Sequence, residues 1–180
     1  APFEKLFSRV GMEVISVQRI VPQGGSIRVM TQKKGGRFQR DSSVDKLINL
    51  EQKLNLDKAE TFLKFDEKIR FVSEKLQKLV YNLKDQGKTI AGFGAPTKAT
   101  TLMAHFNLNE KVLDFIVDDN PLKQGLYTPI SHIPILSADA LYTLQPDYVL
   151  VLAWNFAEPI IKAHQMYSQR IGKFILPMPV

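Results

Sequence analysis

The segment from Thr89 to Thr101 constrains the fold of this 180-residue chain more than any other. It begins with a short apolar stretch, continues through a glycine turn, and becomes helical in pattern at Pro96. We expect Pro96 at the first helical position, where the missing N–H of proline is not needed. Glycines let the backbone approach a ligand, and a helix start presents unpaired N–H groups and a positive dipole end. The segment therefore predicts a strand, a tight turn and a helix start that suits a phosphate or diphosphate.

The chain after this segment keeps alternating between strands and helices, which is typical of a parallel sheet with helices on both faces. The expected strands are residues 89–93, 112–117, 133–136, 148–153 and 173–176, and the expected helices are residues 96–106, 137–144 and 155–170. Ser137 is expected to cap the second of these helices, and Asn155 with Glu158 to form a capping box for the third. The predicted fold class is therefore α/β.

The earlier part of the chain has a different organisation. A helix at residues 3–10, ended by Gly11, and strands at 13–21 and 26–31 cannot bury a core alone, which predicts the end of a larger α/β domain. A long amphipathic helix follows, with apolar residues spaced by three and four. We therefore divide the chain into the end of a truncated domain (residues 1–33), a linker with room for a short helix (34–56), a connecting helix (57–86) and a final α/β domain (87–180).

Composition and charge exclude several classes of protein. The absence of cysteine excludes disulfides and thiolate metal sites within the chain, and the three histidines are too far apart in sequence to predict a metal site. There is no apolar run of about 20 residues and no secretory leader, so we expect a cytoplasmic protein with no membrane partner. The net charge of +6 fits either a solvated basic surface or an anionic ligand. No nucleic-acid motif is present, so nucleic acid is not an expected partner.

The candidate binding residues lie where the expected parallel strands end, because ligands bind at the carboxyl edge of such sheets. They are Gly92, Gly94, Ala95, Pro96, Thr97, Lys98, Asp118, Asn120, Lys123, Gln124, Tyr127, Trp154 and Asn155. A lysine in the first turn of a helix opposes the helix dipole, so Lys98 indicates a bound anion. The glycine motif lacks the third glycine of the dinucleotide fingerprint, and a plain strand-to-helix turn is the alternative.

Two other candidates have equally ordinary alternatives. Asp118 stands where dinucleotide-binding folds hold a ribose, but Asp119, Asn120 and Pro121 also make a simple turn. Trp154 can stack on a sugar or base, or it can pack in the core. No Ser-His-Asp set or carboxylate pair is evident from spacing, so we assign no catalytic residue to this chain.

Residues 87–177 resemble the C-terminal domain of bacterial S-adenosylmethionine-dependent C-methyltransferases, a family that includes the sugar C-3 methyltransferases of deoxysugar biosynthesis. The resemblance is carried by Gly92–Lys98, Asp118–Gly125, Tyr127–Pro129, His132–Ile135 and Trp154–Asn155. The opening residues 3–30 are similar to the last helix and hairpin of that family's methyltransferase domain. The resemblance implies a Rossmann-like domain that helps to hold a nucleotide-sugar.

The resemblance also implies that this chain is part of a longer enzyme. In that family a cysteine-rich zinc-binding region and a methyltransferase domain precede this one, and the Tyr-His-Glu-His catalytic motif lies upstream. We therefore expect the fragment to be inactive and to bind no cofactor itself, while the parent enzyme uses S-adenosylmethionine and zinc. The expected partners are a nucleotide-sugar, the rest of the same polypeptide and a second copy in a homodimer. The alternatives are an NAD-binding oxidoreductase module and a purely structural or dimerisation domain.

Overall fold

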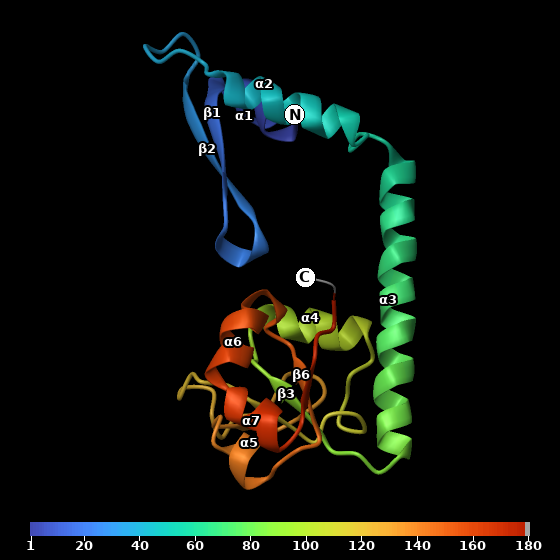
Figure 1. The fold of residues 1–180 in the computed structure, drawn as a ribbon. Coiled ribbons are helices and arrows are strands. Elements are labelled where there is room, and N and C mark those ends of the chain that lie inside the picture. Colours follow the sequence, from blue (N-terminus) through green and yellow to red (C-terminus); the bar gives the residue numbers. More distant parts are fainter. Residues whose placement is uncertain (179–180) are drawn as a thin grey trace. The chain divides into compact units, whose positions relative to one another are not determined.

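The computed structural model describes residues 1–178, apart from the side chain of Arg170. Its internal contacts divide the chain into two units, Ala1–Glu67 and Lys68–Val180. The long helix α3 (Ala59–Asp85) contributes residues to both units (Figure 1). Within the described residues, no helix is long and apolar enough to cross a membrane.

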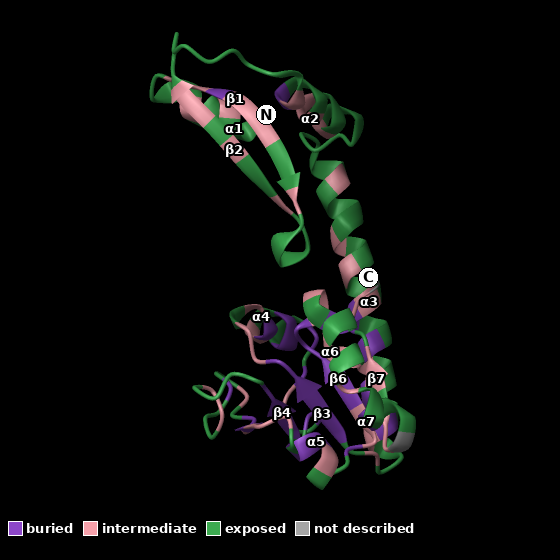
Figure 2. Cartoon of the chain, turned by 60° about the vertical axis from the view of Figure 1, so that its left-hand side comes forward, coloured by how far each residue is buried: buried purple, intermediate pink, exposed green. Residues whose placement is uncertain are grey.

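The first unit has very little core of its own. Before α3 its elements are α1 (Pro2–Arg9), β1 (Met12–Ile20), η1 (Pro22–Gly24), β2 (Ser26–Lys33) and α2 (Ser42–Lys53). The two strands form an antiparallel hairpin with a bulge between Val14 and Ser16. Val14 and Val44 are its only buried hydrophobic residues, and Figure 2 shows the unit almost entirely as exposed or intermediate surface. A two-stranded sheet with so small a core is at best marginally stable alone.

The second unit is built on a five-stranded, entirely parallel sheet, which confirms the predicted fold class. After α3 its elements are β3 (Ile90–Phe93), α4 (Thr97–His105), β4 (Phe115–Val117), β5 (Ile135–Leu136), α5 (Ala140–Thr143), β6 (Tyr148–Val151), η2 (Trp154–Phe156), α6 (Ala157–Ala163), α7 (Gln165–Arg170) and β7 (Lys173–Ile175). The strand order is β5-β4-β3-β6-β7. The chain winds from β3 to one edge and then returns through β6 to the other, so the topological switch point lies between β3 and β6.

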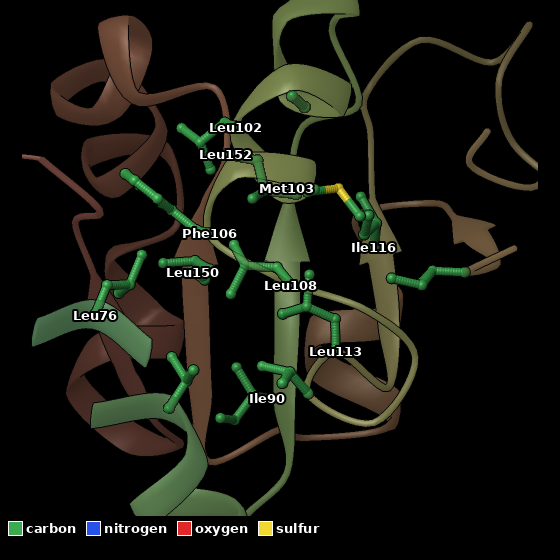
Figure 3. Packing of buried hydrophobic residues seen from close by; sticks show 14 of the residues in the cluster. Leu76, Ile90, Leu102, Met103, Phe106, Leu108, Leu113, Ile116, Leu150 and Leu152 are labelled. Atoms are coloured by element: carbon green, nitrogen blue, oxygen red, sulfur yellow. The ribbon is translucent and has the colours of Figure 1, made fainter. Parts of the chain in front are cut away.

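Helices cover both faces of this sheet. Successive residues of a strand point to opposite faces, so each strand contributes side chains to both of the packed layers. On one face α3 and α4 pack on Ile90, Ile116 and Leu150, a cluster shown close by in Figure 3. On the other face, Leu141 of α5 and Tyr167 of α7 are fully buried against the alternate strand residues. Burying one such side chain contributes roughly 1.5–3 kcal/mol to the stability of the fold. The second unit therefore has the stabilising hydrophobic core that the first unit lacks.

The strand expected at residues 112–117 is wrong in its first half. Only Phe115–Val117 forms β4, whereas Val112 and Leu113 lie in a turn and donate their N–H groups to the carbonyl of Asn109, at 3.0 and 2.9 Å. Both side chains are fully buried against the sheet. A continuous apolar run predicts burial reliably, but it does not distinguish a strand from a buried turn.

The two expected helix caps are also wrong. The cap position of α5 is Asp139 and not Ser137, and no side chain caps that helix. The expected helix at 155–170 is three short elements, η2, α6 and α7, and α6 begins after Phe156 without a side-chain cap. Asn155 is consequently free to make a different contact, which is described below with Lys98.

Two aspartates hold the beginning of the central strand β3. Asp114 accepts the N–H of Ile90 at 2.8 Å and the Lys84 ammonium at 2.9 Å. Asp147 accepts the N–H of Thr89 at 2.9 Å and the Lys88 ammonium at 3.0 Å. The backbone hydrogen bond and the ammonium together hold the pKa of Asp147 at about 2.

This lowered pKa predicts a pH-dependent part of the stability. The free-energy contribution of Asp147 is fully present above the ordinary carboxyl pKa of 3.8 and is lost as the pH falls through about 2. Because the side chain is about a third exposed, solvent screening reduces the contribution to about 1 kcal/mol. Urea unfolding of the wild type and Asp147→Asn should differ by this amount at pH 6, and the difference should vanish near pH 2. A difference that is independent of pH would contradict the assignment.

Candidate functional site

The glycines of the strand-to-helix turn are required by packing. Gly94 has a φ of 88°, in the left-handed region that favours glycine, and a Cβ there would lie 2.6 Å from the Cβ of Ala153. At Gly92, inside β3, an added Cβ would lie 2.8 Å from Ile116 and 2.9 Å from Leu152. Both glycines are therefore explained by the close approach of neighbouring strands, whether or not a ligand binds.

Most N–H groups of this turn are already engaged within the fold. The N–H of Gly94 donates to the carbonyl of Val117 at 2.7 Å, and that of Ala95 donates to Asp118 Oδ2 at 2.6 Å. Pro96 occupies the position that caps α4 and not the first helical position, which corrects the expectation from the sequence. The helix start therefore leaves the N–H groups of Thr97 and Lys98 for an anion, since the first residues of a helix have no partner within it.

Asp118 braces the end of β4 against this turn. It is 8% exposed, and its carboxylate accepts the N–H of Ala95 and, at 2.9 Å, that of Asn120, while Lys123 Nζ lies 3.1 Å away. Burial opposes the charged form, but these hydrogen bonds and the Lys123 ammonium outweigh it and lower the pKa of Asp118. Gln124 donates to the carbonyl of Asp118 at 2.9 Å. Both carboxylate oxygens are thus engaged inside the protein.

Lys98 and the segment after β6 come together at the switch point between β3 and β6. The Lys98 ammonium donates to Asn155 Oδ1 and lies 5.4 Å from the ring centroid of Trp154 and 5.7 Å from that of Phe156. Such cation–π contacts hold the ammonium without neutralising it. Among the described residues no carboxylate lies within ion-pair distance of Lys98. The edge of the sheet therefore carries a positive charge that has polar and aromatic neighbours but no counter-charge.

A pocket of about 300 Å³ lies beside the start of α4. It is lined by Ala95, Pro96, Thr97, Ala99, Thr100, Met103, Ile116, Lys123, Leu126, Tyr127, Thr128, Pro129 and Ile135. A second hollow of about 270 Å³ shares Thr100, Met103, Thr128 and Pro129 with it. A third, of about 560 Å³, lies by α6 and includes Trp154 and Asn155. The structure thus brings Lys123 and Tyr127 to one pocket and places Trp154 and Asn155 at another.

Several site residues are absent from the candidates chosen from the sequence. In the pocket by α4 they are Ala99, Thr100, Met103, Ile116, Leu126, Thr128, Pro129 and Ile135. Phe156 lies beside the Lys98 ammonium, in a segment for which the sequence predicts only a continuous helix. Ile116 of β4 also lines this pocket, and no local signal in the sequence distinguishes it from the other buried strand residues. Asn120 lies in the turn that Asp118 organises, where its Oδ1 accepts the N–H of Leu122 at 3.0 Å.

The histidines do not form a metal centre in the part of the chain that the structure describes, which contains no group of three or more metal-ligating side chains. His164 instead shares a hydrogen bond of 2.9 Å with the Tyr142 hydroxyl, and its ring lies 5.1 Å from that of Phe93. These contacts connect α5 to Phe93, the last residue of β3.

The sheet order and the placement of its helices define a Rossmann-like α/β domain. Residues 22–179 match the family of C-methyltransferase C-terminal domains, and the chain belongs to this family. It is also 33% identical over 174 residues to the C-methyltransferase NovU of Streptomyces niveus. That alignment covers 97% of this chain but only 41% of NovU, so this chain spans less than half of its relative. The family resemblance noted in the sequence is therefore confirmed.

Proposed function

We propose that this chain is the substrate-binding domain of an S-adenosylmethionine-dependent sugar C-methyltransferase and that it holds a nucleotide-sugar. The observation that carries the proposal is the Lys98 ammonium, which lies at the switch point with Asn155 and Trp154 and has no carboxylate partner among residues 1–178. A diphosphate would supply the missing counter-charge and accept the N–H groups at the start of α4. Membership of a methyltransferase family supports a role in binding the substrate of methyl transfer.

In this proposal the chain contributes binding and no chemistry. The parent enzyme would remove a proton beside a keto group of the sugar and transfer a methyl group to the resulting carbanion, using groups upstream of residue 1. S-Adenosylmethionine would supply the methyl group. The chain has no cysteine, and the glycine-turn N–H groups of Gly94 and Ala95 are already engaged, so its residues do not fit the zinc or the S-adenosylmethionine of the parent. We assign both to the remainder of the polypeptide.

The same proposal gives roles to the earlier segments. Residues 1–33 would complete the methyltransferase domain, and residues 34–56 would link that domain to the connecting helix at residues 57–86. Residues 87–180 would bind the substrate. The small core of the first unit, with only Val14 and Val44 buried among its hydrophobic residues, supports packing against the rest of the polypeptide. A cytoplasmic location and a homodimer stay predictions from the sequence.

The geometry gives less support to the NAD-binding alternative. Both oxygens of Asp118 and the N–H groups of Gly94 and Ala95 are engaged within the fold. In NAD-binding folds, the corresponding groups bind the ribose and the pyrophosphate. A structural or dimerisation domain remains the second candidate, because Lys98 could serve only to connect α4 to the segment after β6.

Calorimetric titration tests the proposal. The folded 180-residue chain should bind UDP-glucose or TDP-glucose, and Lys98→Ala should weaken binding about 10-fold, as expected for one charge-assisted hydrogen bond to phosphate. Lys78→Ala is the matched control, since Lys78 is exposed on α3 and lines none of the three hollows.

Three results would contradict the proposal. A folded chain that binds no nucleotide-sugar at millimolar concentration would exclude autonomous binding. Tighter binding of NAD than of either nucleotide-sugar would favour the oxidoreductase module. A Lys98→Ala variant with lowered stability and unchanged affinity would favour the structural role.

A further inference from the structure

The loop at residues 126–131 holds an unusual backbone conformation. Ile130 has a φ of 71° and is 82% exposed. A β-branched residue strongly disfavours this left-handed conformation, which persists only where surrounding contacts impose it. Here the buried Thr128 imposes it: its Oγ1 accepts the N–H of Ile133 at 2.9 Å and lies 3.1 Å from Ser131 Oγ, and its carbonyl accepts the N–H of His132 at 3.2 Å. The loop is therefore rigid, with the strain located at an exposed apolar residue.

This rigid loop forms one wall of a continuous groove along α4. The two hollows of about 300 and 270 Å³ meet at Thr100 and Met103 on the helix and at Thr128 and Pro129 on the loop. Together they are large enough for part of a small molecule. The lining is mostly apolar, and one end of the groove reaches Thr97 at the start of α4.

Tyr127 lines this groove and has two main-chain polar groups without a partner among the described residues. It opposes Pro134 in an isolated antiparallel bridge, with flanking hydrogen bonds of 2.9 Å from Ile135 to Leu126 and from Thr128 to Ile133. In such a bridge the N–H and carbonyl of the central residue point away from the opposite strand. Within residues 1–178 neither main-chain group of Tyr127 has a hydrogen-bond partner. The Tyr127 side chain is 62% exposed and also lines the groove.

We propose that this groove, formed by α4 and residues 126–131, is the nucleobase subsite of the nucleotide-sugar site, an inference that rests on the proposed function. A base is planar, with apolar faces and a few donors and acceptors on its edge. It would lie along the apolar walls and use the free N–H and carbonyl of Tyr127. A sugar ring carries hydroxyl groups that this lining would leave without partners. The diphosphate, bound at the start of α4 and by Lys98, would lie between the base and the sugar.

The rigidity that Thr128 gives the loop then has a function, because a loop held rigid before binding loses less conformational entropy when a base enters. Asparagine tolerates the left-handed conformation much better than isoleucine. We therefore expect Ile130→Asn to unfold at the same or a higher urea concentration than the wild type. Because the loop keeps its conformation in this variant, the dissociation constant for UDP should match that of the wild type. Ile130→Val keeps the β-branch and should match the wild type in both measurements.

A pocket-filling pair of variants tests the location of the base independently of the strain. Thr100→Phe would place a ring in the groove, whereas Thr101→Phe would place the same ring on the exposed side of α4. The probes for calorimetry are UDP, TDP, ADP and inorganic pyrophosphate. We expect Thr100→Phe to weaken the best-binding nucleotide at least about 10-fold and to leave pyrophosphate unchanged, because only the base enters the groove. Thr101→Phe should change neither.

The outcomes separate this inference from the proposed function. If nucleotides bind no more tightly than pyrophosphate, or if Thr100→Phe weakens nucleotides and pyrophosphate equally, the base subsite is overturned while phosphate binding stands. If Thr100→Phe changes neither dissociation constant, the groove is not the subsite. If the folded wild type binds neither pyrophosphate nor any nucleotide, both proposals are overturned.

Discussion

Replacing Gly94 with alanine should destabilise the second unit by about 3 kcal/mol, from left-handed strain of about 1–2 kcal/mol and a steric clash of similar size. The clash arises because the new Cβ would lie 2.6 Å from the Cβ of Ala153, just beyond the ends of the neighbouring strands β3 and β6. Neither strand can move away easily, since they pair in register from Ile90 to Phe93. Urea unfolding followed by the fluorescence of Trp154, the only tryptophan in the chain, measures the change in this unit.

Gly87→Ala provides the matched control for Gly94→Ala. Gly87 has a φ of 74°, but an added Cβ would meet nothing within 4 Å. This variant should therefore be destabilised by backbone strain alone, about 1 kcal/mol. An equal loss of unfolding free energy in the two variants would show that left-handed backbone strain dominates. It would also show that the strands tolerate a methyl group between them.

The strand, turn and helix at residues 89–101 could be predicted because the local residue types determine them. The apolar stretch, the glycines and the proline each restrict the backbone, and the structure shows β3, the turn and α4 there. The parallel sheet followed from the repeated alternation of elements. The shift of Pro96 by one position reflects the uncertainty of helix ends, which sequence patterns locate only to within one or two residues.

The partners of the polar site residues could not be predicted, because they depend on long-range contacts. Asp118 follows a strand in a position suited to a ribose, and nothing local reveals that Ala95, 23 residues earlier, donates to it. Asn155 looked like a helix cap, yet its side chain accepts a hydrogen bond from Lys98. The strain at Ile130 is equally invisible in sequence, since isoleucine is a poor choice for the conformation it adopts.

Replacing Asp118 with alanine should lower the free energy of unfolding by about 3 kcal/mol, because it leaves two N–H groups and an ammonium without their partner. The N–H groups of Ala95 and Asn120 and the Lys123 ammonium all bond to this carboxylate. Asp119 is the matched control: it is the next residue, it is exposed, and Asp119→Ala should change the stability by less than about 0.5 kcal/mol. Fluorescence-detected urea unfolding measures both variants.

Asp118→Asn distinguishes the brace from a direct ligand contact. The oxygen of the new side-chain amide can still accept one of the two backbone N–H groups, but its NH₂ group faces the other. The free energy of unfolding should therefore fall by less than in Asp118→Ala, about 1–2 kcal/mol. If Asp118 acts only as a brace, the same concentration of nucleotide should raise the unfolding midpoint of the variant as much as that of the wild type, since at equal concentration the stabilisation depends on the affinity. If Asp118 binds a ribose, the ligand-induced rise should shrink in the variant. Because both of its oxygens are already engaged, we expect the rise to be equal.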